Sequence, residues 1–221
     1  MMLETITIKS LLPVVFSGME DTEKIRSSQV WGEPSFVFQR GCRMCVQAES
    51  GSGKSSLLNF IFGNRTDYQG EILFDGSNIR TLSIARWCEI RTGGISLLPQ
   101  DMGLFPELSV VQNIELKNNR TGHKSREQIM ELLDRVGIAD KRDVLVGKLS
   151  IGQMQRVALV RSVCQPFDFI FLDEPVSHLD ARNNKIVADM ISEEADSQGA
   201  GIIATSVGNH LLLENAQFIS L

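Results

Sequence analysis

The sequence predicts an α/β fold with a mainly parallel β-sheet, an N-terminal antiparallel β region and a helical insertion. Two continuous apolar runs, residues 167–172 and 201–205, are typical of parallel strands buried on both faces. A helical pattern over residues 184–194 lies between them. Strands that alternate with helices in this way favour a parallel sheet.

The N-terminal part, to about Val46, reads as short β segments separated by polar turns. Residues 11–16 are apolar but few and contain Pro13, so we expect a strand and its exit rather than a signal peptide. Residues 42–47 lead into a glycine-rich loop, and a helix over residues 55–62 opens directly from it. Residues 71–74 predict a further strand, closed by a turn at Asp75 and Gly76.

The pattern becomes helical from about residue 101 to residue 148. It is clearest over residues 125–136, where Ile129, Leu132, Leu133 and Val136 fall on one helix face. We therefore expect one domain over residues 1–221, with a helical subdomain at 101–150 inserted into the sheet-bearing core.

Composition narrows the function classes. The 221 residues are 43% hydrophobic and 22% charged, which suits a well-packed soluble protein. A formal net charge of −5 gives no reason to expect a nucleic-acid partner, because phosphate neutralisation normally needs a basic face. No run approaches the roughly 20 apolar residues of a membrane-spanning helix.

Cys42 and Cys45 form a C-x-x-C pair, which could be a redox pair or half of a zinc site. Because no second pair and no histidine cluster lies nearby in the sequence, we favour buried structural thiols.

The glycine-rich loop matches the phosphate-binding P-loop pattern G-x-x-x-x-G-K-[ST] at Gly53, Lys54 and Ser55. The backbone amides of the loop can surround phosphate oxygens, and Lys54 adds a cation. The N-terminus of the following helix also favours a bound phosphate, and the hydroxyl of Ser55 can reach Mg²⁺. The first glycine is replaced by Ala48, which fits if its φ is negative and is strained by roughly 1–2 kcal/mol if φ is positive. The residues expected to contact the nucleotide phosphates are Glu49, Ser50, Gly51, Ser52, Gly53, Lys54, Ser55 and Ser56.

Two acids follow the hydrophobic strand at residues 167–172. Asp173 is placed to hold Mg²⁺, directly or through water. Glu174 would orient or deprotonate the water that attacks the γ-phosphate. These acids could simply cap a strand, but together with the upstream P-loop they favour phosphoanhydride hydrolysis.

Four further motifs, in order, resemble those of the ATP-binding-cassette (ABC) ATPases. Gln100 stands where that family has its Q-loop glutamine, and residues 105–110 resemble the segment that follows it. Residues 149–153, Leu-Ser-Ile-Gly-Gln, look like the LSGGQ signature, and residues 177–180 correspond to the D-loop. The match covers most of the chain.

This resemblance implies a P-loop NTPase core and an ATP- and Mg²⁺-dependent ATPase. Two copies would face each other, so that Ser150, Gly152 and Gln153 of one close on ATP held by the other. Gln100 would contact the metal and link it to the helical insertion, which in the family docks on a transmembrane permease or partner. A cytoplasmic protein, peripheral on the membrane, is expected. Adenine would stack on Phe16, unless Phe16 is a plain core residue, with Trp31 as the alternative.

The chain departs from the family pattern at Ala48, at Ile151 and at Ser206. Ile151 replaces a signature glycine, and Ser206 stands where the family has a switch histidine. His210 lies four residues on and is not assigned this role, and His178 is expected on the surface. Loss of a group that positions the γ-phosphate and water lowers the rate roughly 10²–10⁴-fold. We therefore expect slow or partner-dependent hydrolysis with ATP binding intact.

The lead-in to the P-loop resembles the branch that serves lipoprotein-release, macrolide-export and cell-division complexes. Two other function classes are open. A soluble ABC protein of DNA repair or translation usually carries a coiled-coil insertion or tandem cassettes, and neither is visible. An ATP-binding regulatory scaffold with little or no hydrolysis is favoured by Ile151 and Ser206, whereas Lys54, Asp173 and Glu174 argue against it.

Overall fold

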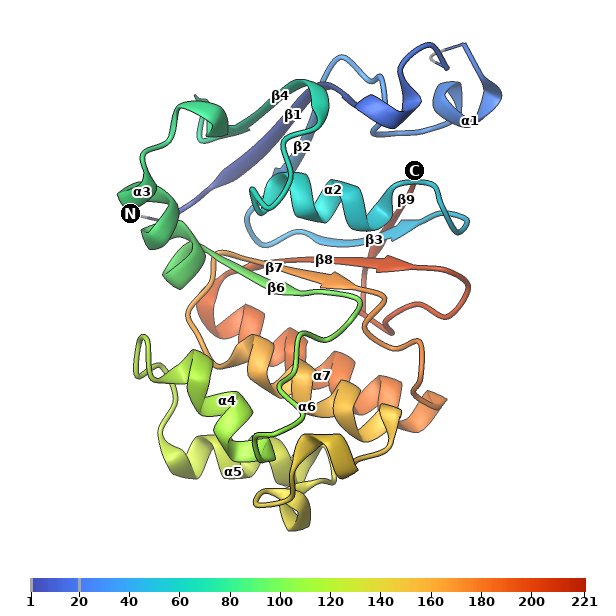
Figure 1. Cartoon of the computed structure of the whole chain (residues 1–221). Helices are drawn as coiled ribbons and strands as arrows, with labels where there is room; N and C mark the ends of the chain where they lie inside the picture. Colours follow the sequence, from blue (N-terminus) through green and yellow to red (C-terminus); the bar gives the residue numbers. More distant parts are fainter. Residues whose placement is uncertain (1, 20) are drawn as a thin grey trace.

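The computed structural model describes residues 2–19 and 21–221 and contains two β-sheets with helices between and below them (Figure 1). The larger sheet has the strand order β6-β7-β8-β3-β9, and each of its pairings is parallel. Its strands are β3 (Arg43–Gln47), β6 (Ile95–Leu98), β7 (Phe169–Asp173), β8 (Gly201–Ser206) and β9 (Gln217–Ser220). The predicted parallel sheet is confirmed.

The second sheet is antiparallel and comes mainly from the N-terminal part of the chain. Its order is β2-β1-β4-β5. The strands are β1 (Thr5–Pro13), β2 (Phe36–Gln39), β4 (Tyr68–Phe74) and β5 (Ser77–Asn78). Asp75 and Gly76 both have positive φ and form the two-residue turn between β4 and β5, as expected for such a hairpin.

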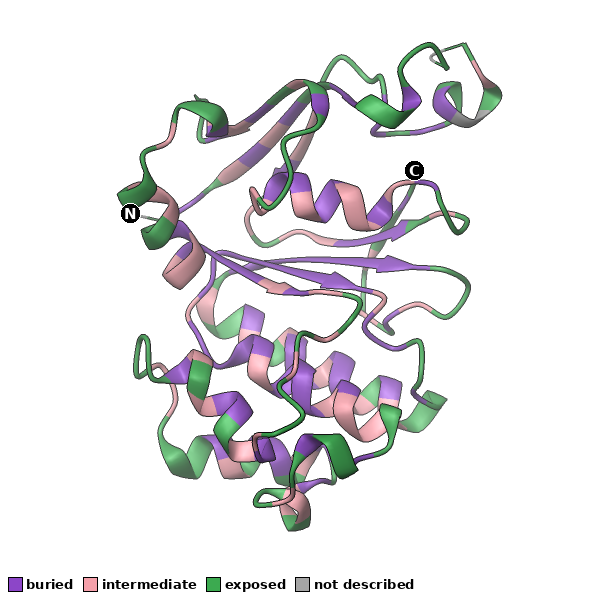
Figure 2. Cartoon of the chain, in the orientation of Figure 1, coloured by how far each residue is buried: buried purple, intermediate pink, exposed green. Residues whose placement is uncertain are grey.

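The helices divide the molecule into layers (Figure 1). The described helices are α1 (Glu23–Arg26), α2 (Lys54–Ile61), α3 (Ile84–Glu89), α4 (Val110–Asn118), α5 (Arg126–Arg135), α6 (Ile151–Val163) and α7 (Ala181–Gln198). Helix α2 lies between the two sheets, and α6 and α7 cover the opposite face of the parallel sheet. Both central strands, β7 and β8, are buried along their whole length (Figure 2), which explains why their sequences are continuously apolar.

Residues 101–150 contain α4, α5 and two short 3₁₀ turns, η4 (Ala139–Lys141) and η5 (Val146–Lys148). Their apolar side chains, including Ile114 and Leu133, share one hydrophobic core with α6 and α7. The segment is therefore packed against the helical layer under the sheet. That it acts as a subdomain of its own stays a prediction.

Three helices of this layer begin with the same local device. Ser109, Ser125 and Ser150 each accept a hydrogen bond from the backbone three residues later, and the glutamine there accepts one from the serine amide. This reciprocal pair satisfies two backbone donors that a helix start otherwise leaves open. The sequence pattern Ser-x-x-Gln thus determines where α4, α5 and α6 begin.

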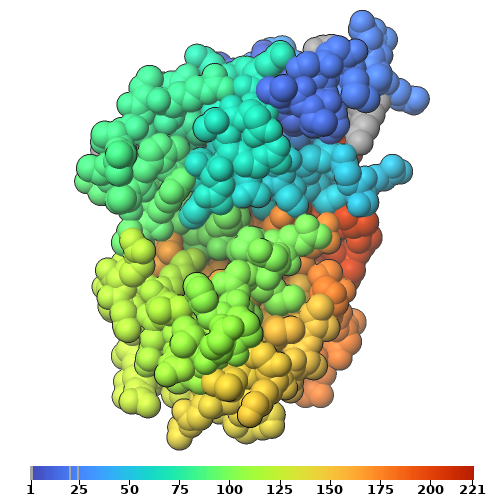
Figure 3. Space-filling view, viewed as in Figure 1, coloured from blue at the N-terminus to red at the C-terminus, as the bar shows by residue number. Residues whose placement is uncertain are grey.

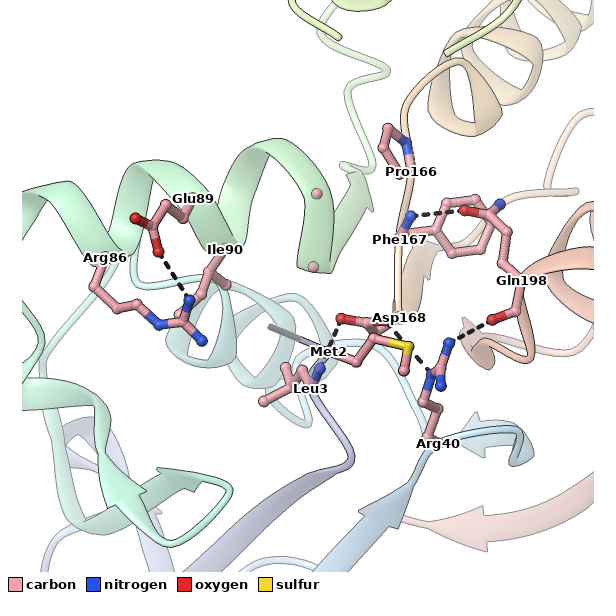
Figure 4. Close-up of a pocket in the computed structure, with 12 residues that line it drawn as sticks. Met2, Leu3, Arg40, Arg86, Glu89, Ile90, Pro166, Phe167, Asp168 and Gln198 are labelled. Carbon is pink, nitrogen blue, oxygen red and sulfur yellow. Dashed lines mark hydrogen bonds and ion pairs between the residues drawn. The ribbon is translucent and has the colours of Figure 1, made fainter.

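The segment before β1 is hydrogen-bonded to the parallel sheet at the amino end of β7, away from the P-loop (Figure 4). Asp168 precedes β7 and accepts a hydrogen bond from the amide of Leu3 at 2.8 Å, while the Nε of Arg40 lies 3.5 Å from its other oxygen. Burial raises the pKa of Asp168. These groups line a cavity of about 390 Å³ that is open at the start of the strands.

Over residues 2–19 and 21–221, none of the helices combines the length and the apolar character that crossing a bilayer requires.

We expect Gly70→Ala to destabilise the N-terminal sheet. Gly70 has a φ of +85°, and an added Cβ would lie 2.3 Å from the carbonyl oxygen of Ser10. The matched control is Gly76→Ala, where φ is +81° and nothing lies within 4 Å. The control should lose about 1–2 kcal/mol of unfolding free energy, and Gly70→Ala about 2 kcal/mol more. Equal midpoints for the two variants in chemical denaturation would contradict the close approach of β4 to β1.

Candidate functional site

Most of the predicted phosphate-site residues meet around one cavity, at the ends of β3 and β7. The cavity has a volume of about 310 Å³. Its walls come from the loop after β3, from the start of α2, and from the exits of β1, β6 and β7. The lining residues are Pro13, Val15, Phe16, Ser50, Gly51, Gly53, Lys54, Ser55, Ser56, Gln100 and Glu174. Of the other predicted phosphate contacts, Glu49 is exposed and Ser52 is buried beneath the loop.

Two glycines shape the loop. Gly51 and Gly53 have φ values of +76° and +98°, which glycine adopts at little energetic cost. A Cβ on Gly53 would also lie 3.1 Å from the ring of Trp31. Ala48 does not have a positive φ, so alanine occupies the first position of the motif without backbone strain.

Lys54 is the first residue of α2 and is buried. Its Nζ donates hydrogen bonds to the carbonyl oxygens of Ala48 at 3.0 Å and Glu49 at 2.8 Å. The ammonium group therefore lies inside the curve of the loop, at the positive end of the helix. A cation and a helix N-terminus at one point form an anion site.

Trp31 supports the loop from below. Its ring is buried, and its Nε1 donates to the carbonyl oxygen of Ser52 at 3.0 Å. It does not line the cavity, so it is a packing residue. Phe16 does line the cavity, but its side chain is only 8% exposed, whereas that of Val15 beside it is 71% exposed. The stacking role of Phe16 stays a prediction, and Val15 offers the larger apolar surface to a base.

The two acids after β7 are held by the neighbouring strand. The hydroxyl of Thr205, in β8, donates to Asp173 at 2.6 Å and accepts from the amide of Glu174 at 3.1 Å. Glu174 has a φ of +49°, a conformation that is strained by about 1–3 kcal/mol for a residue other than glycine. Its carbonyl oxygen accepts further hydrogen bonds from Gln155 and Ser177. These contacts hold Glu174 in its strained conformation at the wall of the cavity.

Six oxygen-bearing side chains line an adjoining cavity of about 620 Å³, and three of them are the predicted metal ligands. Asp173 lines it together with Ser55 and Gln100, which it shares with the first cavity. The Oε1 of Gln100 lies 3.5 Å from the hydroxyl of Ser55. Carboxylate, hydroxyl and amide oxygens are hard ligands of the kind that Mg²⁺ prefers. The residues present therefore fit this metal.

The signature segment lies away from both cavities. Ser150 is exposed at the N-cap of α6, and neither Ser150, Gly152 nor Gln153 is among the residues that line the two cavities. A Cβ on Gly152 would lie 3.0 Å from the carbonyl oxygen of His178, so a larger residue there would crowd the D-loop. Ile151, in contrast, is 47% exposed, and its branched side chain meets no steric obstacle within the chain.

No histidine takes the place of Ser206 among the described residues near it. Ser206 ends β8 and is buried, and its hydroxyl has no hydrogen-bond partner in the described structure. The ring of His210 packs edge-on against Phe218, with 5.1 Å between centroids. His178 is exposed, as expected, and its Nδ1 lies 2.9 Å from the hydroxyl of Ser177.

The structure favours a packing role for the C-x-x-C pair. All four are free thiols. Burial raises the pKa of both Cys42 and Cys45 to about 11, so these thiols stay protonated near neutral pH. Cys45 is fully buried and Cys42 half-buried, which favours the structural interpretation.

Sequence reasoning missed two residues that position the acids. Thr205 carries both hydrogen bonds described above, and Gln155 joins α6 to the segment after β7 through Glu174 and the amide of His178. The available signal for Thr205 was a hydroxyl near the end of β8, a largely apolar strand that pairs with β7. Gln155 begins residues 155–159, which resemble the family sequence after the signature, but that resemblance does not indicate its contacts with the segment after β7.

Comparison with known proteins agrees with this geometry. A family model described as "ABC transporter" matches residues 32–177. The lipoprotein-releasing system ATP-binding protein LolD of Shewanella denitrificans is 30% identical over 81% of this chain and 78% of its own length. The LolD protein of Buchnera aphidicola is 32% identical, with 72% and 71% covered. In fold, the chain is similar to the dimeric bacterial ABC transporter cassette MJ0796, with a TM-score of 0.75 at 21% identity, covering 97% and 94% of the two chains.

We expect Thr205→Val to destabilise the protein by about 1–3 kcal/mol, because it leaves an oxygen of Asp173 and the amide of Glu174 without their hydrogen bonds at nearly unchanged volume. Thr205→Ser keeps the hydroxyl and should lose much less. Denaturant unfolding of the three proteins measures the difference. If serine and valine lost equally, the effect would come from packing of the methyl group and not from the hydroxyl.

Proposed function

The chain belongs to the ABC transporter family and is an ATP-binding motor subunit of an ABC complex, and from this premise we propose that two copies close on Mg-ATP through the residues described above. One observation carries the proposal. The P-loop, Glu174 and Gln100 surround one cavity, and Asp173 lines the cavity that adjoins it, whereas Ser150 is exposed outside both. A second copy can bring its own Ser150 to the phosphates, and ATP then joins the two subunits.

The chain's own residues divide the work of hydrolysis. The amides of the loop and the N-terminus of α2 bind the phosphates, and Lys54 exchanges its contacts with Ala48 and Glu49 for the β- and γ-phosphate oxygens. Ser55, Gln100 and Asp173 would hold Mg²⁺, which supplies charge neutralisation for phosphoryl transfer. Glu174 accepts a proton from the attacking water or orients it.

Closure and opening follow from differential binding. Two separated copies offer ATP only the P-loop side, while the closed pair adds the signature amides and Ser150, so ATP favours the closed state. Hydrolysis removes the γ-phosphate that joins the two sides and releases the pair. The transmembrane partner senses this cycle.

We place the subunit on the cytoplasmic face of the membrane, bound peripherally to a separate transmembrane partner. Its resemblance to the LolD proteins supports the branch that serves lipoprotein release and related export or cell-division complexes. An ATP-binding regulatory scaffold is the second candidate, and the buried, partnerless hydroxyl of Ser206 at the switch position favours it. The intact set of Lys54, Asp173 and Glu174 favours hydrolysis.

Glu174→Gln tests the role of Glu174. The amide keeps the side-chain shape but cannot accept the proton, so ATP binding is retained and hydrolysis falls at least about 10²-fold. The variant should accumulate as an ATP-bound dimer, which size-exclusion chromatography with light scattering detects. Hydrolysis at the parental rate would remove Glu174 from this role.

Ser206→His tests whether the missing switch histidine limits the rate. We expect faster hydrolysis, by about 10-fold or more, because an imidazole adds a positioned proton-transfer group beside the γ-phosphate. Ser206→Ala is the control and should match the parental rate. Rapid turnover by the parental chain, with no gain in a folded Ser206→His variant, would contradict the expectation of slow hydrolysis.

A further inference from the structure

A basic groove lies apart from the nucleotide cavities, on the side of the molecule where α3 and β6 meet α4 and α6. It has a volume of about 460 Å³. Figure 3 shows the waist between the upper part of the molecule, which carries α2 and α3, and the helices α4 and α5 below. None of the residues that line the groove is an acid, and four are cationic: Arg91, Lys117, Arg120 and Arg161.

The amine of Lys117 lies at the wall of this groove. The side chain is half-buried, and its Nζ donates a hydrogen bond to the hydroxyl of Ser96, in β6, at 2.8 Å. That hydroxyl donates in turn to the carbonyl oxygen of Ser162, in α6, at 2.6 Å. Ser96 therefore holds the nitrogen in place, while the groove leaves it accessible to a small molecule.

No carboxylate balances an ammonium group at this position. Over the described residues, none of the four cations takes part in an ion pair. Glu194 acts on Cys164 nearby but is paired with Lys124 at 2.6 Å, and burial raises the pKa of Cys164 to about 12, so that this thiol is uncharged. Burial, and then the charge of Arg161, lower the pKa of Lys117 to about 7, while Cys164 acts in the opposite direction. Near neutral pH a large share of the amine is therefore unprotonated, and an unprotonated lysine is a nucleophile.

Three guanidinium groups line the same groove and keep their positive charge. Arg91 donates three hydrogen bonds and Arg161 donates two, all to backbone carbonyl oxygens, which carry no net charge. Arg120 is exposed, and Asp101 acts on Arg161 from beyond ion-pair distance. Because a guanidinium has five N–H donors, several of them stay available to an anion in the groove.

A nucleophilic amine among positive charges that no acid offsets is arranged to become an anion. We propose that Lys117 reacts with carbon dioxide to form a carbamate. The lone pair of Nζ forms a bond to the carbon of CO₂, one C=O π bond opens onto its oxygen as the negative charge, and one proton leaves the nitrogen for water. The product keeps one N–H, which donates to Ser96 as before, and its two oxygens accept N–H groups of the neighbouring guanidinium groups.

Lys185 is the contrast within the same chain. Its Nζ donates to Asp189 at 2.7 Å and to Glu214 at 3.3 Å, and these hydrogen bonds raise its pKa. Lys185 therefore stays an ammonium group near neutral pH and has no lone pair to offer. At Lys117 the reaction makes the charge of the basic groove depend on dissolved carbon dioxide. It needs neither nucleotide nor a second copy, so it stands apart from the proposed function.

Carbon-13 NMR of the full chain with ¹³C-labelled bicarbonate tests the proposal at about pH 7.5. There an amine with a pKa of about 7 is mostly unprotonated, whereas an ordinary lysine, with a pKa of about 10.4, is protonated. The α-amino group, with a pKa of about 7.7–8.0, also reacts. We therefore expect two carbamate signals from the parental chain and one from Lys117→Arg, whose guanidinium is always protonated.

Chemical trapping assigns the site in the parental protein, so the result does not depend on whether a variant folds. Triethyloxonium converts a carbamate into a stable ethoxycarbonyl group, which peptide mass spectrometry locates. We expect this group on Lys117 and not on Lys185.

Arg120→Gln and Arg126→Gln form a matched pair for the NMR measurement. Arg120 lines the groove, whereas Arg126 is exposed at the start of α5 outside it. Because the exposed Arg120 helps to neutralise the carbamate, its removal should lower the equilibrium constant for carbamate formation about 2–5-fold. Removing Arg126 should leave that constant unchanged.

Four results would overturn the proposal. The first is a parental chain that shows the α-amino signal alone, and the second is a second signal that persists in Lys117→Arg. The third is an ethoxycarbonyl group on other lysines but not on Lys117. The fourth is an equal loss of the carbamate in the two arginine variants, which would show that the groove does not stabilise the anion.

Discussion

The hydrogen bond between Thr205 and Asp173 joins two neighbouring parallel strands at the edge where the chemistry is gathered. It is 2.6 Å long and buried, and the same hydroxyl accepts from the amide of Glu174. Parallel strands bring their carboxyl ends to one edge of a sheet, so the loop after β3 and the acids after β7 lie close together. Strand β8 lies between β7 and β3, and its hydroxyl at Thr205 orients both acids.

Three residues at this edge have backbone conformations that most residues avoid. Gly51, Gly53 and Glu174 all have positive φ. The loop keeps its shape because Trp31 packs beneath Gly53 and binds the carbonyl of Ser52, and Glu174 keeps its shape because Gln155 and Thr205 bind its backbone. Rigid support of this kind preorganises donors for an anion, so little reorganisation is left for the moment of reaction.

The P-loop and the signature segment lie in different parts of the molecule. The P-loop residues lie around the cavity, and the signature serine caps α6 elsewhere. In the proposed function the second copy supplies the signature serine, so assembly and nucleotide binding become one equilibrium.

By itself the sequence determined the order of elements, the parallel sheet and most of the residues that meet around the predicted phosphate site. Local rules suffice for these features: apolar runs make buried strands, Ser-x-x-Gln starts a helix, and Gly-Lys-Ser opens a helix towards phosphate. Only the tertiary structure decided that Ala48 is unstrained, that Trp31 supports the loop instead of facing a base, and that Thr205 holds both acids. It also brought four cations from separate parts of the chain to one cavity: Arg91, Lys117, Arg120 and Arg161. Each of these depends on contacts between residues far apart in the chain, and the spacing of residues along a sequence carries no information about which distant side chain will lie opposite.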